Sequence, residues 1–319
     1  MLRILVYGFY NNKNIGDDLF ECAFKAIFPE FEFVFTTRFT KENLKNCDAV
    51  FFGGGSFVYS QINKDASCWD LLKSKKIFYI GIGVESLIHQ EHEELMSSAQ
   101  LIACRSLEEI DRLKKLNSNS IFINDIVFSL DAQRSQEKIS NSILVIPNIS
   151  VVPNNSSPHW MQAAWGYFKS EFSQFLDDLS GTHKIFFLPA SISQRLNDSA
   201  AAHEIISATA SRSGVLIDVQ NFTNQQEIIG FISQFETVIT QRFHGIVFCE
   251  MTNTPYIALH HHSKLQNSQP HSGIALDYYG LKKSALHDAH RAAAGIQFSA
   301  VDKDQYAKLN STVRKLLVK

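Results

Sequence analysis

The sequence predicts an α/β protein made of two doubly wound, Rossmann-like lobes with a central cleft. Short apolar runs alternate with segments whose apolar residues return every three or four positions, which is the pattern of alternating strands and helices. The chain has 319 residues, too many for one typical core and enough for two ordinary domains. A polar stretch at 131–142, DAQRSQEKISNS, interrupts the alternation and separates a lobe at 1–135 from a lobe at 143–319.

The first lobe alternates between strand and helix from its start. Expected helices are 17–27, 68–73, 89–97 and 107–116, and Ser106 and Glu109 have the spacing of a capping box before the last of them. Expected strands are 4–7, 31–35, 49–52, 77–80, 101–103 and 121–123. This order favours a parallel sheet with right-handed crossovers.

The second lobe repeats the alternation. Expected strands are 143–146, 184–188, 215–218, 237–239 and 256–259. A helix at 159–179 carries an apolar stripe that we interpret as a core face, formed by Trp160, Ala164, Tyr167, Phe168, Phe172, Phe175 and Leu179. In a two-lobed chain the last helix, 303–317, can cross back onto the first lobe.

Composition and charge narrow the class of protein. Apolar residues make up 45% of the chain and charged residues 19%, which is typical of a globular protein. A net charge of −2 argues against a nucleic-acid partner. The five cysteines form no CxxC pair, which favours reduced thiols and a cytoplasmic protein. No stretch approaches the ~20 apolar residues needed to span a bilayer. Peripheral contact with the inner face of a membrane stays open, and the oligomeric state is not indicated.

The segment at 238–259, VITQRFHGIVFCEMTNTPYIAL, predicts a strand, a turn, a helix and a second strand. Arg242 and His244 stand where the helix should begin. Backbone N–H groups and the helix dipole favour an anion there, and open α/β sheets bind ligands at this edge. Arg242 offers a bidentate fork to phosphate or carboxylate, and His244 can donate to phosphate or carry a proton. The alternative is a surface ion pair for Arg242 and an ordinary polar role for His244.

Glycines of the first lobe cluster at predicted strand ends. Gly8 and Gly16 bracket one loop, Gly53, Gly54, Gly55 and Ser56 follow the third strand, and Gly81 and Gly83 end the fourth. Each alone is consistent with a structural turn, but three such ends on one edge favour a ligand-binding floor.

The loop before the first helix contains Asn14 and Asp17. Either residue can be a helix N-cap, which is the simpler interpretation of the spacing. The functional alternative makes Asp17 a carboxylate that orients or deprotonates a sugar hydroxyl.

The run His260, His261 and His262, with His271 nearby, raises the question of a metal site. Consecutive strand residues face opposite sides, so at most His260 and His262 converge, and no carboxylate or cysteine has a ligand spacing. A loop at the mouth of the cleft is the favoured interpretation, with no metal.

Together these motifs resemble the polysaccharide pyruvyl transferase family over roughly residues 4–265. The matching segments are GFYNNKNIGDDLF at 8–20, FFGGGSF at 51–57, GIGVES at 81–86, CRSLEEIDRL at 104–113, NDIVFSL at 124–130, FFLPASISQRLNDSAAA at 186–202 and TQRFHGIVFCEMTNTPYIAL at 240–259. The chain departs from the family where Ser106 replaces a frequent acidic residue. It departs again where HHHSKLQ replaces an Asp-Pro-Lys stretch and leaves only Lys264.

The resemblance implies a fold like that of the GT-B glycosyltransferases. It also implies transfer of the pyruvyl group of phosphoenolpyruvate to two hydroxyls of a sugar in a surface polysaccharide or a lipid-linked precursor, with a ketal formed and phosphate released. By resemblance, Arg242 and His244 would hold the donor in the second lobe, and His244 or Asp17 would move protons. Arg105 and Lys264 would add cations, while Asn14, Gly16 and the Gly53–Ser56 loop would bind substrate in the first lobe. This scheme requires neither a metal nor a nucleotide cofactor.

Two other hypotheses stay open at this point. A nucleotide-sugar glycosyltransferase or epimerase of GT-B type also places basic residues and a carboxylate at a second-lobe turn, and here Glu250 lies eight residues after Arg242. Stabilisation by UDP-sugars instead of phosphoenolpyruvate would favour it. A non-catalytic relative that binds glycans is the third hypothesis, and the joint presence of Asp17, Arg242 and His244 argues against it.

Overall fold

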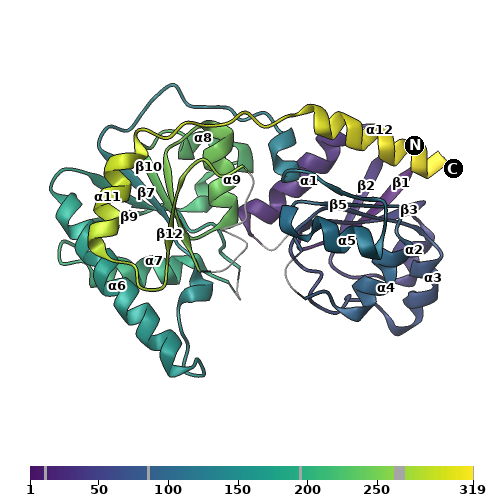
Figure 1. Ribbon diagram of the computed structural model, residues 1–319, viewed down its shortest axis with the longest axis horizontal. Helices are drawn as coiled ribbons and strands as arrows, with labels where there is room; N and C mark the ends of the chain where they lie inside the picture. Colours follow the sequence, from purple (N-terminus) through teal and green to yellow (C-terminus); the bar gives the residue numbers. More distant parts are fainter. Residues whose placement is uncertain (11–12, 85–86, 194–195, 262–269, 319) are drawn as a thin grey trace. The chain divides into compact units, whose positions relative to one another are not determined.

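The computed structural model describes residues 1–10, 13–84, 87–193, 196–261 and 270–318. The chain divides into two compact units, which Figure 1 shows as two separate sheets with their helices. The first unit comprises Met1–Asn12, Gly16–Asp131 and Ala300–Lys319, and the second comprises Lys13–Ile15 and Ala132–Ser299.

The first unit contains a six-stranded sheet in the order β2-β1-β3-β4-β5-β6, with every neighbouring pair parallel. Its strands are β1 (Arg3–Tyr7), β2 (Glu32–Thr36), β3 (Ala49–Gly55), β4 (Lys76–Ile82), β5 (Leu101–Cys104) and β6 (Ser120–Phe122). Its α-helices are α1 (Ile15–Ile27), α2 (Lys41–Lys45), α3 (Trp69–Lys73), α4 (Gln90–Ser98), α5 (Ile110–Leu116) and α12 (Asp304–Val318). Short 3₁₀ turns are η1 (Ala66–Cys68), η2 (Leu107–Glu109) and η3 (Ile126–Ser129).

Both faces of this sheet are covered, which explains why its strands are continuous apolar runs. Helices α2 to α5 pack on one face against buried residues such as Val50, Phe52 and Tyr79. On the other face, Phe24 of α1 packs its ring against Phe51 with a centroid separation of 6.2 Å.

The last helix, α12, is part of the first unit, beside α1 in Figure 1. Leu309 and Val313 are buried, and the Tyr306 hydroxyl donates to the Asp125 carbonyl at 2.8 Å. Asn310 Nδ2 donates to the Ile27 carbonyl at the end of α1, at 2.5 Å. The chain end therefore contributes to the core of the unit that contains the N-terminal strand.

The second unit has a parallel six-stranded sheet in the order β12-β11-β10-β7-β8-β9. Its strands are β7 (Ser142–Ile146), β8 (Lys184–Phe187), β9 (Gly214–Leu216), β10 (Thr237–Thr240), β11 (Tyr256–His260) and β12 (Ile274–Asp277). Its α-helices are α6 (His159–Ser180), α7 (Asp198–Ala208), α8 (Gln225–Ile232), α9 (Phe243–Thr252) and α11 (Lys283–Ala293), and its 3₁₀ turns are η4 (Ile149–Val151) and η5 (Val219–Asn221).

The core of the second unit includes the long helix α6. Its buried face is formed by Trp165, Phe168, Phe172, Phe175 and Leu176. The predicted stripe is therefore correct from Phe168 onward and wrong before it, because Trp160 is 60% exposed and Tyr167 is 41% exposed. Trp165, which the predicted stripe omitted, lies one helical turn before Phe168 and is buried on the same face.

The two parallel sheets with interleaved helices confirm the predicted fold class, and every predicted strand is present. The capping box at the start of the 107–116 helix is wrong: Ser106 makes no side-chain cap bond, and its Oγ accepts from Val84 N at 3.0 Å. That segment begins with the 3₁₀ turn η2 and becomes α-helical at Ile110.

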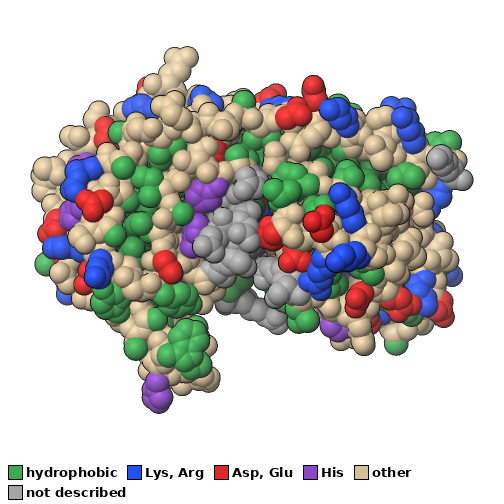
Figure 2. Space-filling view, in the orientation of Figure 1, with side chains coloured by type: hydrophobic (Ala, Val, Ile, Leu, Met, Phe, Trp, Pro, Cys, Tyr) green, Lys and Arg blue, Asp and Glu red, His purple; other side chains and the backbone are tan. Residues whose placement is uncertain are grey.

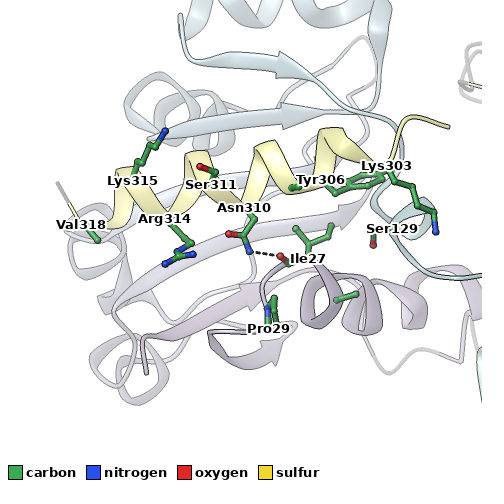
Figure 3. Close-up of a pocket in the computed structure, with 12 residues that line it drawn as sticks. Ile27, Pro29, Ser129, Lys303, Tyr306, Asn310, Ser311, Arg314, Lys315 and Val318 are labelled. Atoms are coloured by element: carbon green, nitrogen blue, oxygen red, sulfur yellow. Dashed lines mark hydrogen bonds between the residues drawn. The ribbon is translucent and has the colours of Figure 1, made fainter.

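Within the described residues, no helix is long and apolar enough to cross a membrane. Figure 2 shows acidic and basic side chains interspersed on the visible face, in keeping with the net charge of −2. A cavity of about 990 Å³ lies along α12, lined partly by Ile27, Tyr306 and Arg314 (Figure 3). Among the residues that the structure describes, no predicted site residue lines this cavity.

Candidate functional site

The topology of the second unit places the candidate site at a switch point of the sheet. Strands β7 and β10 are neighbours, and the chain leaves β7 towards β8 but leaves β10 towards β11, on the opposite side. Open α/β sheets bind ligands at the carboxyl ends of such strands. Asn148 follows β7 at this edge, and Gln241 and Arg242 follow β10.

The turn between β10 and α9 is fixed by Thr240. Its Oγ1 accepts from Arg242 N and donates to the Arg242 carbonyl, both at 3.0 Å. Arg242 is the N-cap of α9 and has an extended backbone. A Cβ on Gly245 would lie 2.1 Å from Thr240 Oγ1, so only glycine lets the first turn of α9 approach β10 this closely.

Arg242 is held by a buried carboxylate. Its Nε donates to Asp198 Oδ2 at 3.0 Å and its Nη2 donates to Asp198 Oδ1. The Asp198 side chain is fully buried, whereas the Arg242 side chain keeps 16% exposure. The predicted cation thus stands at the strand-end edge, with one edge of its guanidinium bound to the protein.

Asp198, the first residue of α7, receives two further hydrogen bonds from the backbone. Ile149 N donates to Oδ1 and Ser191 N donates to Oδ2, each at 2.9 Å. Burial raises the pKa of the Asp198 carboxyl, while Arg242 and the two N–H donors act in the opposite direction. Four donors directed at one carboxyl group favour its ionised form.

Gln241 and Asn148 connect the ends of β10 and β7. The Gln241 Oε1 accepts from Asn148 N at 3.0 Å, and Asn148 Nδ2 lies 3.4 Å from His261 Nε2. Gln241 is 3% exposed, and its Nε2 has no partner within the described residues. Because buried polar groups are normally paired, such a donor is a feature that a bound ligand or water would satisfy.

His244 lies in the first turn of α9 and is partly buried. Its ring stacks on Phe248, with centroids 6.1 Å apart, and contacts Phe243 edge-on at 5.4 Å. These contacts hold the imidazole at the beginning of the helix, close in sequence and in the fold to Arg242.

His260 contacts His271, which lies outside the run of three histidines. Its Nε2 lies 3.2 Å from His271 Nε2, and His271 Nδ1 lies 3.3 Å from the Tyr256 hydroxyl. The Tyr256 hydroxyl donates to Glu250 Oε1 at 2.7 Å. Glu250 also accepts from Ser272 Oγ at 3.0 Å and from Ser272 N. The chain from Glu250 to His260 is a buried polar network, and His262 lies outside the described residues.

Ligand binding is not needed to explain the glycines Gly53 and Gly54 of the first unit. A Cβ on Gly53 would lie 2.2 Å from the Phe24 ring, and one on Gly54 the same distance from Phe20. Both aromatic residues belong to α1, so these glycines allow the helix to pack on the end of β3. Gly55 has a φ of +89°, and a Cβ there would make ordinary van der Waals contacts, the nearest at 3.5 Å from Asp17 Oδ1.

Asp17 lies inside the first turn of α1, which begins at Ile15, so the N-cap interpretation is wrong for this residue. Its carboxylate is partly buried beside the end of β3 and is favourably placed near the positive end of the helix dipole. Gly16 is buried in the same turn.

Arg105 forms a buried ion pair with Asp125. Its side chain is 4% exposed, and its Nη2 donates to Ser56 Oγ at 3.4 Å. A Cβ on Gly83 would lie 2.2 Å from that Ser56 Oγ. The loop ends after β3, β4 and β5 therefore meet, but little of the Arg105 guanidinium faces solvent.

Asn14 belongs to the second unit, where it forms an isolated backbone bridge with Ser191. Ile15 N donates to the Ala190 carbonyl at 3.0 Å. Since Ser191 N binds Asp198, the Asn14 segment supports the loop that holds the Arg242 partner. The predicted cation Lys264 lies outside the described residues.

Three residues of this edge were not predicted: Asp198, Asn148 and Gln241. Asp198 is 44 residues from Arg242, and the local sequence signals only a helix start, with Asn197 as its N-cap. Asn148 carried a detectable signal in the sequence, because it is a polar residue two positions after an apolar strand, at the edge where open α/β sheets bind ligands.

A family model and several solved structures match this chain. The family model for polysaccharide pyruvyl transferase matches residues 14–263. A search of curated proteins found none that matches. Among solved structures, the chain is similar to the UDP-GlcNAc 2-epimerase from Methanocaldococcus jannaschii in complex with UDP-GlcNAc and UDP, with TM-score 0.61, 8% identity and 100% of each chain covered.

A putative UDP-N-acetylglucosamine 2-epimerase from Listeria monocytogenes is similar with TM-score 0.60 and 9% identity, over 98% of this chain and 96% of that one. At such identities the likeness shows the fold alone, which is GT-B-like. The match to the family model covers the strand-end residues of both units, and the chain belongs to the polysaccharide pyruvyl transferase family.

Proposed function

We propose that this protein transfers the pyruvyl group of phosphoenolpyruvate onto two hydroxyls of one sugar, in a surface polysaccharide or its lipid-linked precursor. The products are a ketal and phosphate. The observation that carries this proposal is the braced guanidinium of Arg242 beside His244, at the switch point of a sheet whose sequence matches the family model. Family membership supports a sugar acceptor, and the identity of the donor is part of the proposal.

The charge at this edge is suited to a small anion. The Arg242–Asp198 pair is close to neutral, so the guanidinium contributes directional donors more than net charge. The first turn of α9 adds the positive end of its dipole and backbone N–H groups. The buried amide of Gln241 adds a donor without a partner in the described residues. Together these groups suit the carboxylate or phosphate of the donor.

The proposed reaction balances with protons alone. The methylene carbon of phosphoenolpyruvate gains a proton, and the adjacent carbon develops oxocarbenium character and bonds to the first sugar hydroxyl oxygen, which loses its proton. The second hydroxyl oxygen attacks the same carbon, the bond to phosphate breaks, and phosphate leaves with the second proton. Donors fixed at the leaving group before the reaction lower the barrier.

His244 and Asp17 are the proposed proton carriers. His244, held between Phe243 and Phe248, is the proposed acid for the donor, because an imidazole is the side chain most often used for general acid catalysis. Asp17 is the proposed base for the acceptor. The proposed substrate-binding residues Gly16, Gly55, Ser56 and Arg105 belong to the same unit. The scheme uses no metal and no nucleotide cofactor. The five unpaired cysteines agree with a cytoplasmic reaction.

The test is direct. The purified chain is incubated with phosphoenolpyruvate and a panel of glycosides, and phosphate release is measured together with product mass. We expect the wild type to form a product that is heavier by one pyruvyl ketal. We expect His244→Ala to form none. Thermal-shift titrations with phosphoenolpyruvate and with UDP-GlcNAc run in parallel. Stabilisation by UDP-GlcNAc alone, with no turnover of phosphoenolpyruvate, would reject the proposal.

A further inference from the structure

We infer that Asp198 is a positioning residue that selects which edge of the Arg242 guanidinium meets the donor. This inference rests on the proposed function, because it assigns Arg242 to the anionic donor. Asp198 holds the edge formed by Nε and Nη2, and the edge formed by Nη1 and Nη2 binds the carboxylate or phosphate of phosphoenolpyruvate.

Asp198 itself is held in place by the backbone. Its two oxygens accept from Ile149 N and Ser191 N at 2.9 Å, and its own N–H donates to the Ser191 carbonyl at 2.8 Å. The carboxylate is therefore anchored by three separate pieces of backbone: η4, the loop after β8, and the start of α7. A fixed acceptor fixes the plane of the guanidinium that binds it.

Arg242 has more N–H donors than Asp198 uses. A guanidinium has five N–H groups, arranged in two bidentate edges. Asp198 uses one N–H from Nε and one from Nη2. Three N–H groups remain, two on Nη1 and one on Nη2, and they form the second edge. That edge has the fork geometry that matches a carboxylate or a phosphate.

The two partners of the ion pair differ in their exposure to solvent. The Asp198 side chain is fully buried, while the Arg242 side chain keeps 16% exposure at the carboxyl ends of β7 and β10. The side of the pair that meets the protein is thus Asp198, and the accessible part is Arg242. An ion pair that only stabilised the fold would not require an accessible guanidinium at the topological switch point of the sheet.

An NMR experiment tests the choice of edge. With ¹⁵N-labelled arginine, the Nε–H resonance of Arg242 is assigned by its loss in Arg242→Lys. Adding phosphoenolpyruvate to the wild type should shift the Nη resonances of Arg242 and leave its Nε–H resonance in place. A donor that displaces Asp198 would move the Nε–H resonance, and that result would overturn the inference.

Two variants and one control test the role of Asp198 in donor binding. Asp198→Asn is close to isosteric but offers the guanidinium an amide, and we expect the Kd for phosphoenolpyruvate to rise at least tenfold. Asp198→Glu keeps the charge, displaces it by one methylene, and should show a smaller rise together with a shifted Nε–H resonance. This second variant reports on the inference even where the first fails to fold. Glu204→Gln, an exposed residue of the same helix, is the control and should bind the donor as the wild type does.

The outcomes separate this inference from the proposed function. Unchanged donor affinity in a folded Asp198→Asn or Asp198→Glu protein, with only a lower Tm, would make the pair structural and reject the positioning role. Failure of the wild type to bind phosphoenolpyruvate at all would reject the proposed function. In that case a moved Nε–H resonance in Asp198→Glu would still show that Asp198 orients Arg242, and an unmoved one would refute it.

Discussion

The guanidinium of Arg242 makes two hydrogen bonds to one carboxylate, and an ammonium group cannot reproduce them. Arg242→Lys should lower the free energy of unfolding by about 1.5 to 3 kcal/mol, since one hydrogen bond to a charged group is lost. It should also abolish turnover of phosphoenolpyruvate, because a point charge lacks a second edge for the donor. Chemical denaturation and phosphate release check the two effects.

Arg291→Lys is the matched control for that change. Arg291 pairs with Asp288 at the surface, where both side chains are at least 70% exposed. Exposed pairs contribute little, so stability and turnover should both stay at the wild-type level. Equal effects of the two substitutions would contradict the special geometry of Arg242.

His92 is a buried histidine whose titration limits stability in acid. It is fully buried, with its Nδ1 3.1 Å from the Tyr79 hydroxyl. Burial lowers the pKa of His92 from 6.5 to about 3. Between these values the unfolded chain binds a proton that the native chain does not, so stability falls as the pH drops from 6.5 towards 3. The loss between pH 7 and pH 5 is about 2 kcal/mol.

His92→Asn removes this titration and keeps an acceptor for Tyr79. Unfolding in urea at pH 7 and pH 5 should show a change smaller than in the wild type by about 2 kcal/mol, even where the variant is less stable at both pH values. His203→Asn, at an exposed position, should leave the pH dependence as it is. The same pH dependence in wild type and His92→Asn would contradict the assignment.

At the scale of elements, the strands were predictable because each is an apolar run that two layers of helices bury. The edge strand β12 was missed, since its four residues alternate between half-buried and exposed. Helix α7 was missed too, and with it Asp198, whose partner lies in a different element. The position of Arg242 was predictable because a strand, a turn and a helix follow each other without a gap in the sequence.

The docking of α9 on β10 depends on Gly245. Gly245→Ala would bring a Cβ to 2.1 Å from Thr240 Oγ1, and we expect it to lower the free energy of unfolding by about 1 to 3 kcal/mol. It should also weaken donor binding, because Arg242 and His244 are carried by the same turn. Gly166→Ala on α6 is the matched substitution: a Cβ there has no atom within 4 Å, so stability should rise by about 0.5 to 1 kcal/mol. Two changes of the same sign would refute this account of Gly245.

The network from Glu250 to His260 ties α9 to β11 and to the segment before β12. Because the Tyr256 hydroxyl donates to Glu250, its oxygen accepts from His271, which must carry its proton on Nδ1. His271 Nε2 then accepts from His260 Nε2–H. Burial lowers the pKa of His271, which favours this neutral form.

The tautomer of His271 is measurable by ¹⁵N NMR. We expect a protonated Nδ1 and an unprotonated Nε2 in the wild type. Glu250→Gln can present an amide donor to Tyr256, and should shift the population towards protonated Nε2. Glu236→Gln, at an exposed position, should have no effect. A wild-type His271 with its proton on Nε2 would overturn the direction of this network.

At the scale of the whole molecule, the sequence was sufficient for two parallel sheets and for the edge of each that carries polar residues. Which polar residues meet could not be predicted, because buried pairs such as Arg105–Asp125 and Arg242–Asp198 join positions 20 and 44 residues apart. The local spacing of apolar residues predicts the helix or strand to which a residue belongs. These ion pairs depend instead on how loops from several strands meet at one edge of a sheet.

The two units have separate hydrophobic cores, so we expect each to respond to substitutions in its own core. Leu309 on α12 is 1% exposed in the first unit, and Leu286 on α11 is fully buried in the second. Leu309→Ala and Leu286→Ala should each lower the free energy of unfolding of the unit that contains the substitution by about 2 to 5 kcal/mol.

Tryptophan fluorescence distinguishes the two units. Trp69 reports on the unfolding of the first unit and the buried Trp165 on that of the second, each in a protein in which the other tryptophans are replaced. Leu309→Ala should lower the unfolding midpoint seen by Trp69 although it lies 240 residues along the chain from that reporter, and Leu286→Ala the midpoint seen by Trp165. If the unfolding midpoints at Trp69 and Trp165 shifted equally in both variants, the two units would unfold as one cooperative block. That result would contradict the expectation that each unit responds to substitutions in its own core.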